Sequence, residues 1–336
     1  KAWGLVDEVV PPRLFAEKVR EHALALAAKT DRPKDAKGIA LTPLRRAIDE
    51  KGLHYEHVDV AVDADARTIT ILVAGPSAEE AEDIDAIVER GAQWWPLAMA
   101  RELDDAILHL RTNVREAGIW IVKTRGDIDA ALRIDRALDR HKDHWFVRET
   151  LGSLRRTLAR LDVSSRSIYA VIDRESAFAG TLFELALAAD RSYMLLADDG
   201  PRVALSAMNA GPFAMVNGAT RLETRFGGNA DVEKETPFDA EEAIDRGLVT
   251  FAPDELDWND ELRLAIEERA SLSPDALTGM EASLRFAGKE TVATKIFGRL
   301  SAWQNWIFIR PNAVGEQGAL KLFGSGTKPR FTWERV

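Results

Sequence analysis

Hydrophobic and polar residues near the start of the chain follow the spacings of a helix, a linker and a strand hairpin. Residues 12–28 have hydrophobic side chains at helical spacing, which predicts an amphipathic helix. The polar, proline-interrupted residues 30–37 are typical of a linker. Hydrophobic and polar side chains alternate at roughly every second position over residues 54–62, and residues 68–73 have a strong strand pattern. Asp63 to Asp65 separate these two segments, so we expect a hairpin. The hydrophobic side of the helix consists of Leu14, Phe15, Val19 and Leu26.

Helix and strand patterns then alternate along the chain. Ser77 and Glu80 have the spacing of a capping box, which predicts a helix that ends near Gly91. From Asp239 onward the pattern is mostly helical. This alternation is typical of an α/β fold. Further helices are expected at residues 95–111, 128–140, 146–159 and 177–189, and strands at residues 118–124, 167–173, 192–197 and 202–206.

A short internal similarity bears on the domain organisation. Gly-Leu-Val occurs at residues 4–6 and again at residues 247–249, an offset of 243 residues, and an amphipathic helix follows each copy. Coincidence is the alternative, because three matching residues are a short match. If the similarity is not a coincidence, the chain begins with the end of one module and then contains a second module. We therefore expect three parts: residues 1–30 as the edge of a preceding module, residues 31–275 as a second module, and residues 276–336 as a helical segment for dimerisation or closure.

The second copy extends into a longer motif. Asp239 to Val249 resembles the A-x-x-x-G-L-V-D-x-V-V-P signature of the crotonase (enoyl-CoA hydratase) superfamily. Ser167 to Asp190, Val203 to Gly228 and Phe323 to Phe331 resemble other superfamily segments in the same order, so the resemblance covers most of the chain. It implies a spiral of ββα units with a C-terminal helical region. It also implies a coenzyme A thioester as the substrate, with no further cofactor and no metal.

Within the superfamily, Ser301 to Arg330 is most similar to the C-terminal part of the benzoyl-CoA-dihydrodiol lyases, which are about twice the usual length. That length agrees with the internal similarity. The resemblance implies a carbon–carbon lyase of benzoate degradation. Such an enzyme opens the oxidised ring of a benzoyl-CoA, in its 2,3-epoxy or dihydrodiol form, and releases formate without molecular oxygen. It also implies a preceding module in the same protein as a partner, and a homodimer.

Superfamily members hold the thioester oxygen between two backbone N–H groups, and glutamates move protons at neighbouring carbons. By resemblance, Glu184 stands at the first glutamate position, and Thr181 supplies the second N–H. Most of the catalytic features have changed, however. The Gly-Gly-Gly run reads Gly180-Thr181-Leu182; residues 124–129 replace the first oxyanion loop, Ala207 stands at the second glutamate position, and residues 213–218 replace a glycine-rich loop.

Two hypotheses follow from these changes. In the first, this part of the protein is an inactive scaffold and dimerisation half, Glu184 is a structural acid, and the active residues lie before Lys1. In the second, the chain is a self-contained acyl-CoA hydratase or isomerase that uses Glu184 with the Thr181 N–H. Phe323 matches the position of an adenine-stacking phenylalanine, and Lys328 is a shifted substitute for a ligand-binding lysine. The alternative for Phe323 is packing within a helical core.

Other candidate residues have ordinary structural explanations. The pairs His54/His57 and His141/His144 have the spacing of metal ligands on a helix, but neither has a matched third ligand, so surface or capping roles are expected. The aromatic groups Trp94/Trp95 and Trp303/Trp306/Phe308 could line a pocket, although such groups more often form a core or a subunit interface.

Composition and charge narrow the function classes. The net charge of −10 is a poor match to a nucleic-acid backbone and argues against a third hypothesis, an RNA-binding relative. The charge is uneven, because residues 277–336 hold nine Lys or Arg against four acids. The chain has no cysteine, which excludes disulfides and thiolate chemistry within it. No leader or uninterrupted membrane-length apolar stretch is visible, so a cytoplasmic protein without membrane contact is expected.

Overall fold

The computed structural model describes residues 1–31, 35–228, 233–286, 288 and 290–335, and it divides the chain into two units, Lys1–Ala40 and Leu41–Val336. In the first unit a short 3₁₀ turn, Pro12–Leu14, leads into helix α1 (Phe15–Ala27), as predicted. No residue of α1 is buried, and Phe15 and Leu26 are 61% and 66% exposed. The hydrophobic side of this helix therefore has no cover within its own unit. Residues 32–34 of the predicted linker lie outside the described residues.

The second unit is built on one mixed β-sheet whose strands follow one another in chain order. Strands β1 to β4 pair antiparallel, whereas β4 to β7 pair parallel. Every residue of β6 is buried, as expected for a strand covered on both faces. The strands are β1 (Ala47–Ile48), β2 (Gly52–His54), β3 (Val58–Asp63), β4 (Thr68–Ala74), β5 (Ile119–Arg125), β6 (Ser167–Ile172) and β7 (Arg191–Met194).

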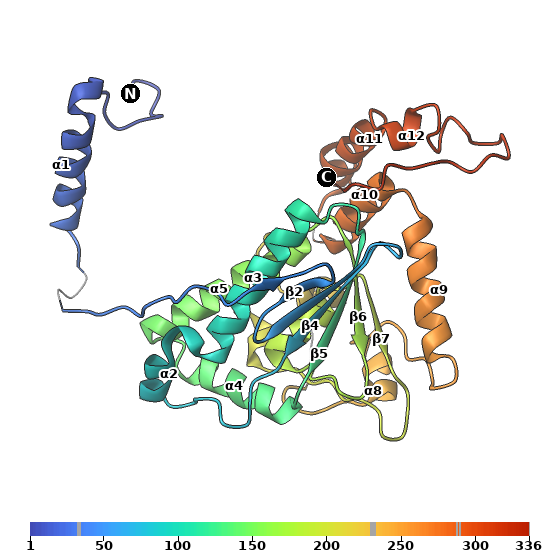
Figure 1. Cartoon of the computed structure of the whole chain (residues 1–336), viewed down its shortest axis with the longest axis horizontal. Helices are drawn as coiled ribbons and strands as arrows, with labels where there is room; N and C mark the ends of the chain where they lie inside the picture. The colour runs from blue at the N-terminus through green and yellow to red at the C-terminus, as the bar shows by residue number, and fades with distance from the viewer. Residues whose placement is uncertain (32–34, 229–232, 287, 289, 336) are drawn as a thin grey trace. The chain divides into compact units, whose positions relative to one another are not determined.

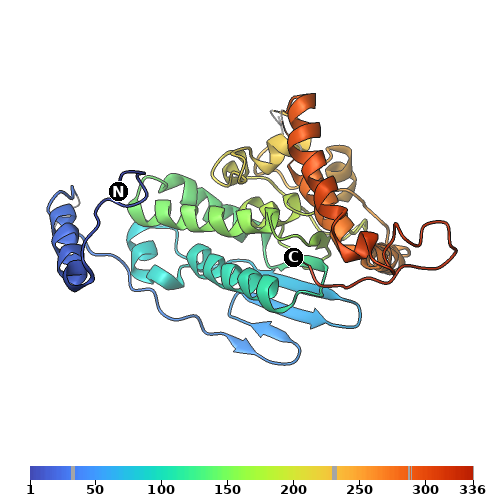
Figure 2. The same ribbon diagram turned by 90° about the horizontal axis from the view of Figure 1, so that it is seen from above.

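Helices cover this sheet and extend it at the C-terminal end. Helices α3 and α5 run side by side against one side of the sheet (Figure 2). Helix α9 lies beyond β7, on the other side from α3 and α5 (Figure 1). The helices of this unit are α2 (Ile84–Arg90), α3 (Trp95–Asn113), α4 (Ile128–Arg140), α5 (Trp145–Asp162), α6 (Phe183–Leu187), α7 (Arg221–Phe226), α8 (Ala240–Asp245), α9 (Trp258–Ser271), α10 (Pro274–Arg285), α11 (Ser301–Ile307) and α12 (Pro311–Val314).

The hairpin predicted from residues 54–62 and 68–73 is confirmed by the antiparallel pairing of β3 and β4, but the prediction that its first strand begins at residue 54 was wrong. The Tyr55 N–H donates to the Val58 carbonyl at 2.9 Å, and this tight turn divides the segment into β2 and β3. The start of the next helix was also wrong. Asp83 rather than Ser77 caps α2, since its side chain accepts the Asp85 N–H at 3.0 Å, although the helix does end at Gly91 as predicted.

The helix expected over residues 177–189 is much shorter. Ala179 pairs with Ala204 in a parallel bridge, and the Gly180 N–H donates to the Ala204 carbonyl at 2.9 Å. These contacts keep the chain extended up to a 3₁₀ turn, Gly180–Leu182, so α6 begins only at Phe183. The strand expected over residues 202–206 is reduced to isolated bridges at Val203 and Ala204.

The sheet and its helices enclose the core. Trp94 and Trp95 are buried in it, and their indole N–H groups donate to the carbonyls of Ala81 and Ala74, at 3.1 and 2.9 Å. The core interpretation of this pair is therefore confirmed. At the other end, the helices stop at Val314, and the described chain then runs without helix or strand to Arg335, which is 4% exposed.

Candidate functional site

The turn between β6 and α6 brings Thr181 and Glu184 into the interior. Thr181 and Glu184 are 3% and 1% exposed. Gly180 has a φ of +50°, and a β-carbon there would lie 1.7 Å from a carboxylate oxygen of Asp135. Glycine is therefore required at this position by a protein side chain, independently of any ligand.

The Thr181 N–H is not free to bind a thioester oxygen in this structure. It donates to Oδ2 of Asp135 at 2.8 Å, and the Thr181 hydroxyl donates to Oδ1 of the same carboxylate at 2.5 Å. The Ser206 hydroxyl adds a third hydrogen bond, to Oδ2 at 2.6 Å. A carboxylate of the protein thus occupies the position that the superfamily resemblance assigns to the substrate oxygen.

Asp135 is the residue that sequence reasoning missed. It lies on α4, is 2% exposed, and shares the inward side of that helix with Ala131 and Leu138. Burial raises its pKa to about 6, against the opposing effect of the hydrogen bonds from Ser206 and Thr181. An aspartate among the apolar positions of an amphipathic helix was the available signal, because such a residue needs a buried partner.

Glu184 is held by two neighbours. Its carboxylate accepts the Asn209 side-chain amide at 2.8 Å and forms an ion pair with Nη1 of Arg221 at 2.8 Å. Arg221 also binds Asp162 through Nη2, at 2.9 and 3.0 Å to the two oxygens. Burial raises the pKa of Glu184, and the positive charge of Arg221 opposes this effect. The ion pair joins α6 to α7 and, through Asp162, to the end of α5.

The segments that replace the other family loops also have internal partners. The Gly126 N–H, at the end of β5, donates to the Glu175 carbonyl at 3.1 Å, and Asp127 caps α4. Ala207 begins a short 3₁₀ turn that Ser206 caps. In the segment of residues 213–218, the carbonyl of Phe213 accepts a hydrogen bond from Arg221 at 3.2 Å. The described contacts therefore do not form an open pair of N–H donors.

Phe323 and Lys328 lie in the irregular C-terminal segment, and both are exposed. Phe323 is 90% exposed, so the expectation that it packs within a helical core was wrong. The cause is that the helices end at Val314, before this segment begins. Among the described residues, neither side chain has a contact that connects it with Thr181 or Glu184.

Three histidines of the two candidate pairs have a structural partner for their side chain. His54 bonds to Asp59 at 2.5 Å, and His144 caps α5 by accepting the Phe146 N–H. The ring of His141 bonds to the Glu82 carbonyl at 3.1 Å. Ligand atoms of Glu56, His57 and Glu102 do lie within 4.8 Å of one another, a grouping that the sequence did not indicate. The Glu102 carboxylate, however, already accepts the backbone N–H groups of His57 and Val58, at 2.7 and 3.1 Å.

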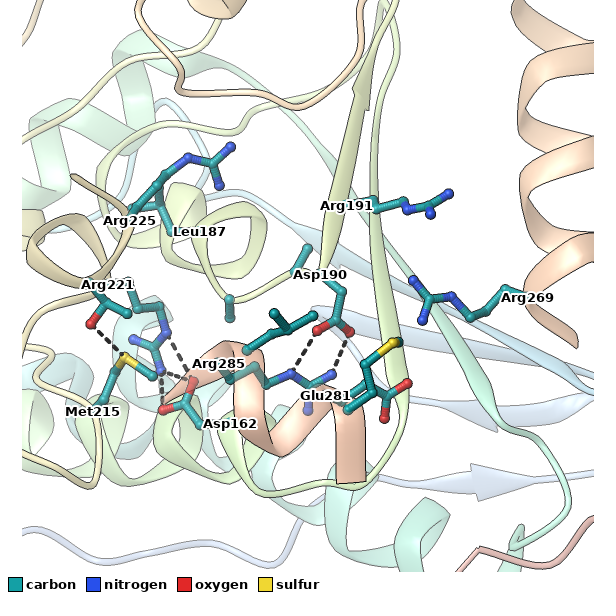
Figure 3. A pocket seen from close by; sticks show the side chains of 15 residues that line it. Asp162, Leu187, Asp190, Arg191, Met215, Arg221, Arg225, Arg269, Glu281 and Arg285 are labelled. Carbon is teal, nitrogen blue, oxygen red and sulfur yellow. Dashed lines mark hydrogen bonds and ion pairs between the residues drawn. The ribbon is translucent and has the colours of Figure 1, made fainter. Parts of the chain in front are cut away.

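A pocket of about 390 Å³ lies on the other side of Arg221 from Glu184. Its walls come from the ends of α5 and α6, the start of β7, and helices α7, α9 and α10 (Figure 3). Arginines dominate its charged lining: Arg191, Arg221, Arg225, Arg269 and Arg285. In the part of the chain that the structure describes, no helix has the length and apolar character needed to cross a bilayer.

Comparison with known proteins identifies relatives of both the sequence and the fold. No family model matches the chain. The sequence is 58% identical over 348 residues to a benzoyl-CoA-dihydrodiol lyase from Aromatoleum evansii, and the match covers 100% of this chain and 62% of that protein. The chain thus spans less than two thirds of the length of this relative.

Solved structures resemble this chain at the level of the fold. An enoyl-CoA hydratase from Geobacillus kaustophilus HTA426 superposes with a TM-score of 0.59 at 16% identity, covering 83% of this chain and 98% of that one. An enoyl-CoA hydratase from Bacillus anthracis gives a TM-score of 0.56 at 18% identity, covering 83% and 100%. The chain therefore has the fold of these enoyl-CoA hydratases, and over its whole length its sequence is similar to that of a benzoyl-CoA-dihydrodiol lyase.

Proposed function

We propose that this chain is the C-terminal scaffold half of a carbon–carbon lyase that opens the ring of an oxidised benzoyl-CoA and releases formate. In this proposal the acyl-CoA thioester is bound and processed by a preceding crotonase module of the same cytoplasmic protein. The 58% identity to a benzoyl-CoA-dihydrodiol lyase supports the reaction class. The length of that relative outside the match is consistent with a further module.

One observation carries the scaffold assignment. The Thr181 N–H, which would stabilise the charge that develops on a thioester oxygen, already donates to Asp135 at 2.8 Å. A second anion could enter only if the Asp135 carboxylate moved away or became protonated, because two negative groups cannot share one buried donor at low cost. The turn at Thr181 thus binds the fixed carboxylate of Asp135 in place of the transient oxyanion of a substrate.

The alternative of a self-contained hydratase or isomerase using Glu184 has less support. A general base must reach a substrate carbon with a free oxygen. The two Glu184 oxygens are instead bound to Asn209 and Arg221, and the side chain is buried. Glu184 fits better as an acid that joins helices α6 and α7.

The remaining partners are also part of the proposal. The uncovered hydrophobic side of α1, including Phe15, Val19 and Leu26, would pack on the preceding module. Exposed apolar residues of the C-terminal segment, such as Phe297 at 77% and Ile309 at 76%, would contribute to a homodimer. Phe323 and Lys328 are exposed and could still contact coenzyme A bound elsewhere in the complete protein.

Calorimetry of the purified chain with benzoyl-CoA tests the assignment directly. We expect no benzoyl-CoA binding that depends on Glu184, and no formate release by the chain from the 2,3-epoxy or dihydrodiol form, whereas the complete Aromatoleum evansii lyase assayed in parallel opens the ring of that oxidised form. Benzoyl-CoA binding by the chain that disappears in Glu184→Gln but persists in Asp162→Asn would refute the scaffold assignment. Asp162 is the matched control, since it binds the same Arg221 but does not occupy a superfamily site position.

A further inference from the structure

The pocket beside β7 holds positive charge that the protein itself does not neutralise. Three acids line it, and each is already paired: Asp162 with Arg221, Asp190 with Arg285, and Glu281 with Arg335. The lining arginines Arg191, Arg225 and Arg269 form no ion pair with any residue that the structure describes. The pocket thus carries more cationic groups than it has carboxylates to bind them.

Arg269, at the end of α9, shows this most clearly. The residue is only 7% exposed, and its Nε donates to the Tyr169 hydroxyl at 3.1 Å. Its Nη1 is buried and has no hydrogen-bond partner among the described residues. A buried guanidinium N–H without an acceptor is unfavourable, so Arg269 has an unused donor that favours an acceptor once the side chain turns toward the pocket.

Arg191, the first residue of β7, lies next to Arg269 at one side of the pocket (Figure 3). The Cζ atoms of both arginines are 5.8 Å from the centre of the Tyr169 ring. Ring contacts of this kind use the flat face of a guanidinium and leave its in-plane N–H groups available. The Tyr193 hydroxyl takes up part of the donor capacity of Arg191, and the exposed Glu268 attracts Arg191 at longer range but does not form an ion pair with it.

We propose that this pocket binds a phosphate-class dianion between Arg191 and Arg269. Two guanidinium groups can donate several charge-assisted hydrogen bonds to one phosphate, and its charge offsets theirs. The volume of about 390 Å³ lies within the range of small-ligand pockets and leaves room for more than the anion itself. The phosphate can be inorganic or part of a nucleotide such as coenzyme A.

The site is distinct from the position of Thr181 and Asp135. Arg221 stands between them, because its Nη1 binds Glu184 on one side and its Nη2 binds Asp162 in the pocket wall. Binding of the anion does not require acyl-CoA chemistry, so its test is independent of the scaffold assignment.

Titration of the full chain with inorganic phosphate tests the proposal, with chloride at matched ionic strength as the blank. We expect saturable binding by wild type, measured by calorimetry and as a rise in Tm, and at least tenfold weaker binding in Arg191→Gln and Arg269→Gln. Arg263→Gln is the matched control on α9, since its exposed guanidinium pairs with Asp260 and Glu267 and it should bind phosphate as wild type does. Arg191 is partly exposed, so its variant remains informative if loss of the buried Arg269 impairs folding.

Two further arms identify the source of the phosphate. If coenzyme A competes with inorganic phosphate and binds more weakly to the Arg191→Gln variant, the ligand of the pocket is a nucleotide phosphate. If inorganic phosphate binds without affecting the binding of coenzyme A, the ligand is a free anion. The proposal is overturned if wild type binds neither probe, or if wild type and Arg191→Gln respond equally to both.

Discussion

Replacing Asp135 with asparagine should remove one titration from the folding equilibrium and leave the shape of the site intact. An asparagine oxygen can accept the Thr181 N–H and the Ser206 hydroxyl where Oδ2 now does. Its amide nitrogen would replace Oδ1 and donate to the Thr181 hydroxyl, which can accept as well as donate. The variant therefore keeps three hydrogen bonds while the buried negative charge is lost.

The size of the effect follows from the pKa. Burial raises the pKa of Asp135 from 3.8 to about 6 in the folded protein. Because the folded pKa lies above the unfolded one, the stability that the neutral carboxyl contributes is fully present below about pH 4 and is lost as pH rises through 6. One pH unit of pKa shift corresponds to about 1.4 kcal/mol, so ionisation of Asp135 lowers the free energy of unfolding of the wild type by about 3 kcal/mol.

The assay is urea unfolding of wild type and Asp135→Asn at intervals from pH 4 to pH 8. The free energy of unfolding of the variant, minus that of the wild type, should rise by about 2–3 kcal/mol over this range, with unchanged m-values. Other titrating groups largely cancel in the difference. The matched control is Asp129→Asn, an exposed position on the same helix. A flat difference for Asp135→Asn would show that the carboxylate ionises without a burial penalty, which would contradict the enclosed geometry around Thr181.

Three further predictions test other parts of the structure. Arg221→Met should lower the free energy of unfolding by about 3–5 kcal/mol, measured by urea denaturation, because its two carboxylate partners would stay buried without a counter-charge. Gly180→Ala should lower it by at least about 1–3 kcal/mol, since alanine is strained at a φ of +50° and its β-carbon would meet Asp135; unfolding at wild-type urea concentrations would contradict this. Leu26→Glu in the first unit should change it by less than about 0.5 kcal/mol, because the side chain is 66% exposed; a larger loss would show that α1 is covered in solution.

The sequence patterns located elements whose own side chains decide their structure. Strands β4, β5 and β6 and helices α3, α4 and α5 were predicted within a few residues, because long apolar runs and helical periodicity are local signals. The errors fall where contacts distant in sequence decide the backbone. Helix α6 begins late because Ala204 pairs with the preceding residues, and nothing between residues 177 and 189 indicates that pairing.

The same distinction applies to the candidate site. Family resemblance singled out Thr181 and Glu184, which lie together at one buried turn, but it did not indicate the side chains that bind them. Asp135 is 46 residues from Thr181, and Arg221 is 37 residues from Glu184, so neither partner belongs to a local motif. Asp135 could have been found from its inward position on α4, whereas Arg221 needed the fold.

The contacts around Gly180 give a physical reason why this turn needs one glycine and not the Gly-Gly-Gly run that it resembles. A turn that presents N–H groups to the interior needs a hydrogen-bond acceptor, and a substrate oxygen supplies one only while it is bound. Asp135 supplies one permanently, at 2.8 Å from the Thr181 nitrogen, and Gly180 remains necessary because any β-carbon there would displace that carboxylate. Once the partner is permanent, the approach of a ligand no longer requires the next two positions to be glycine, and threonine can add its hydroxyl as a further donor. One buried aspartate thus explains both the glycine at position 180 and the threonine at position 181.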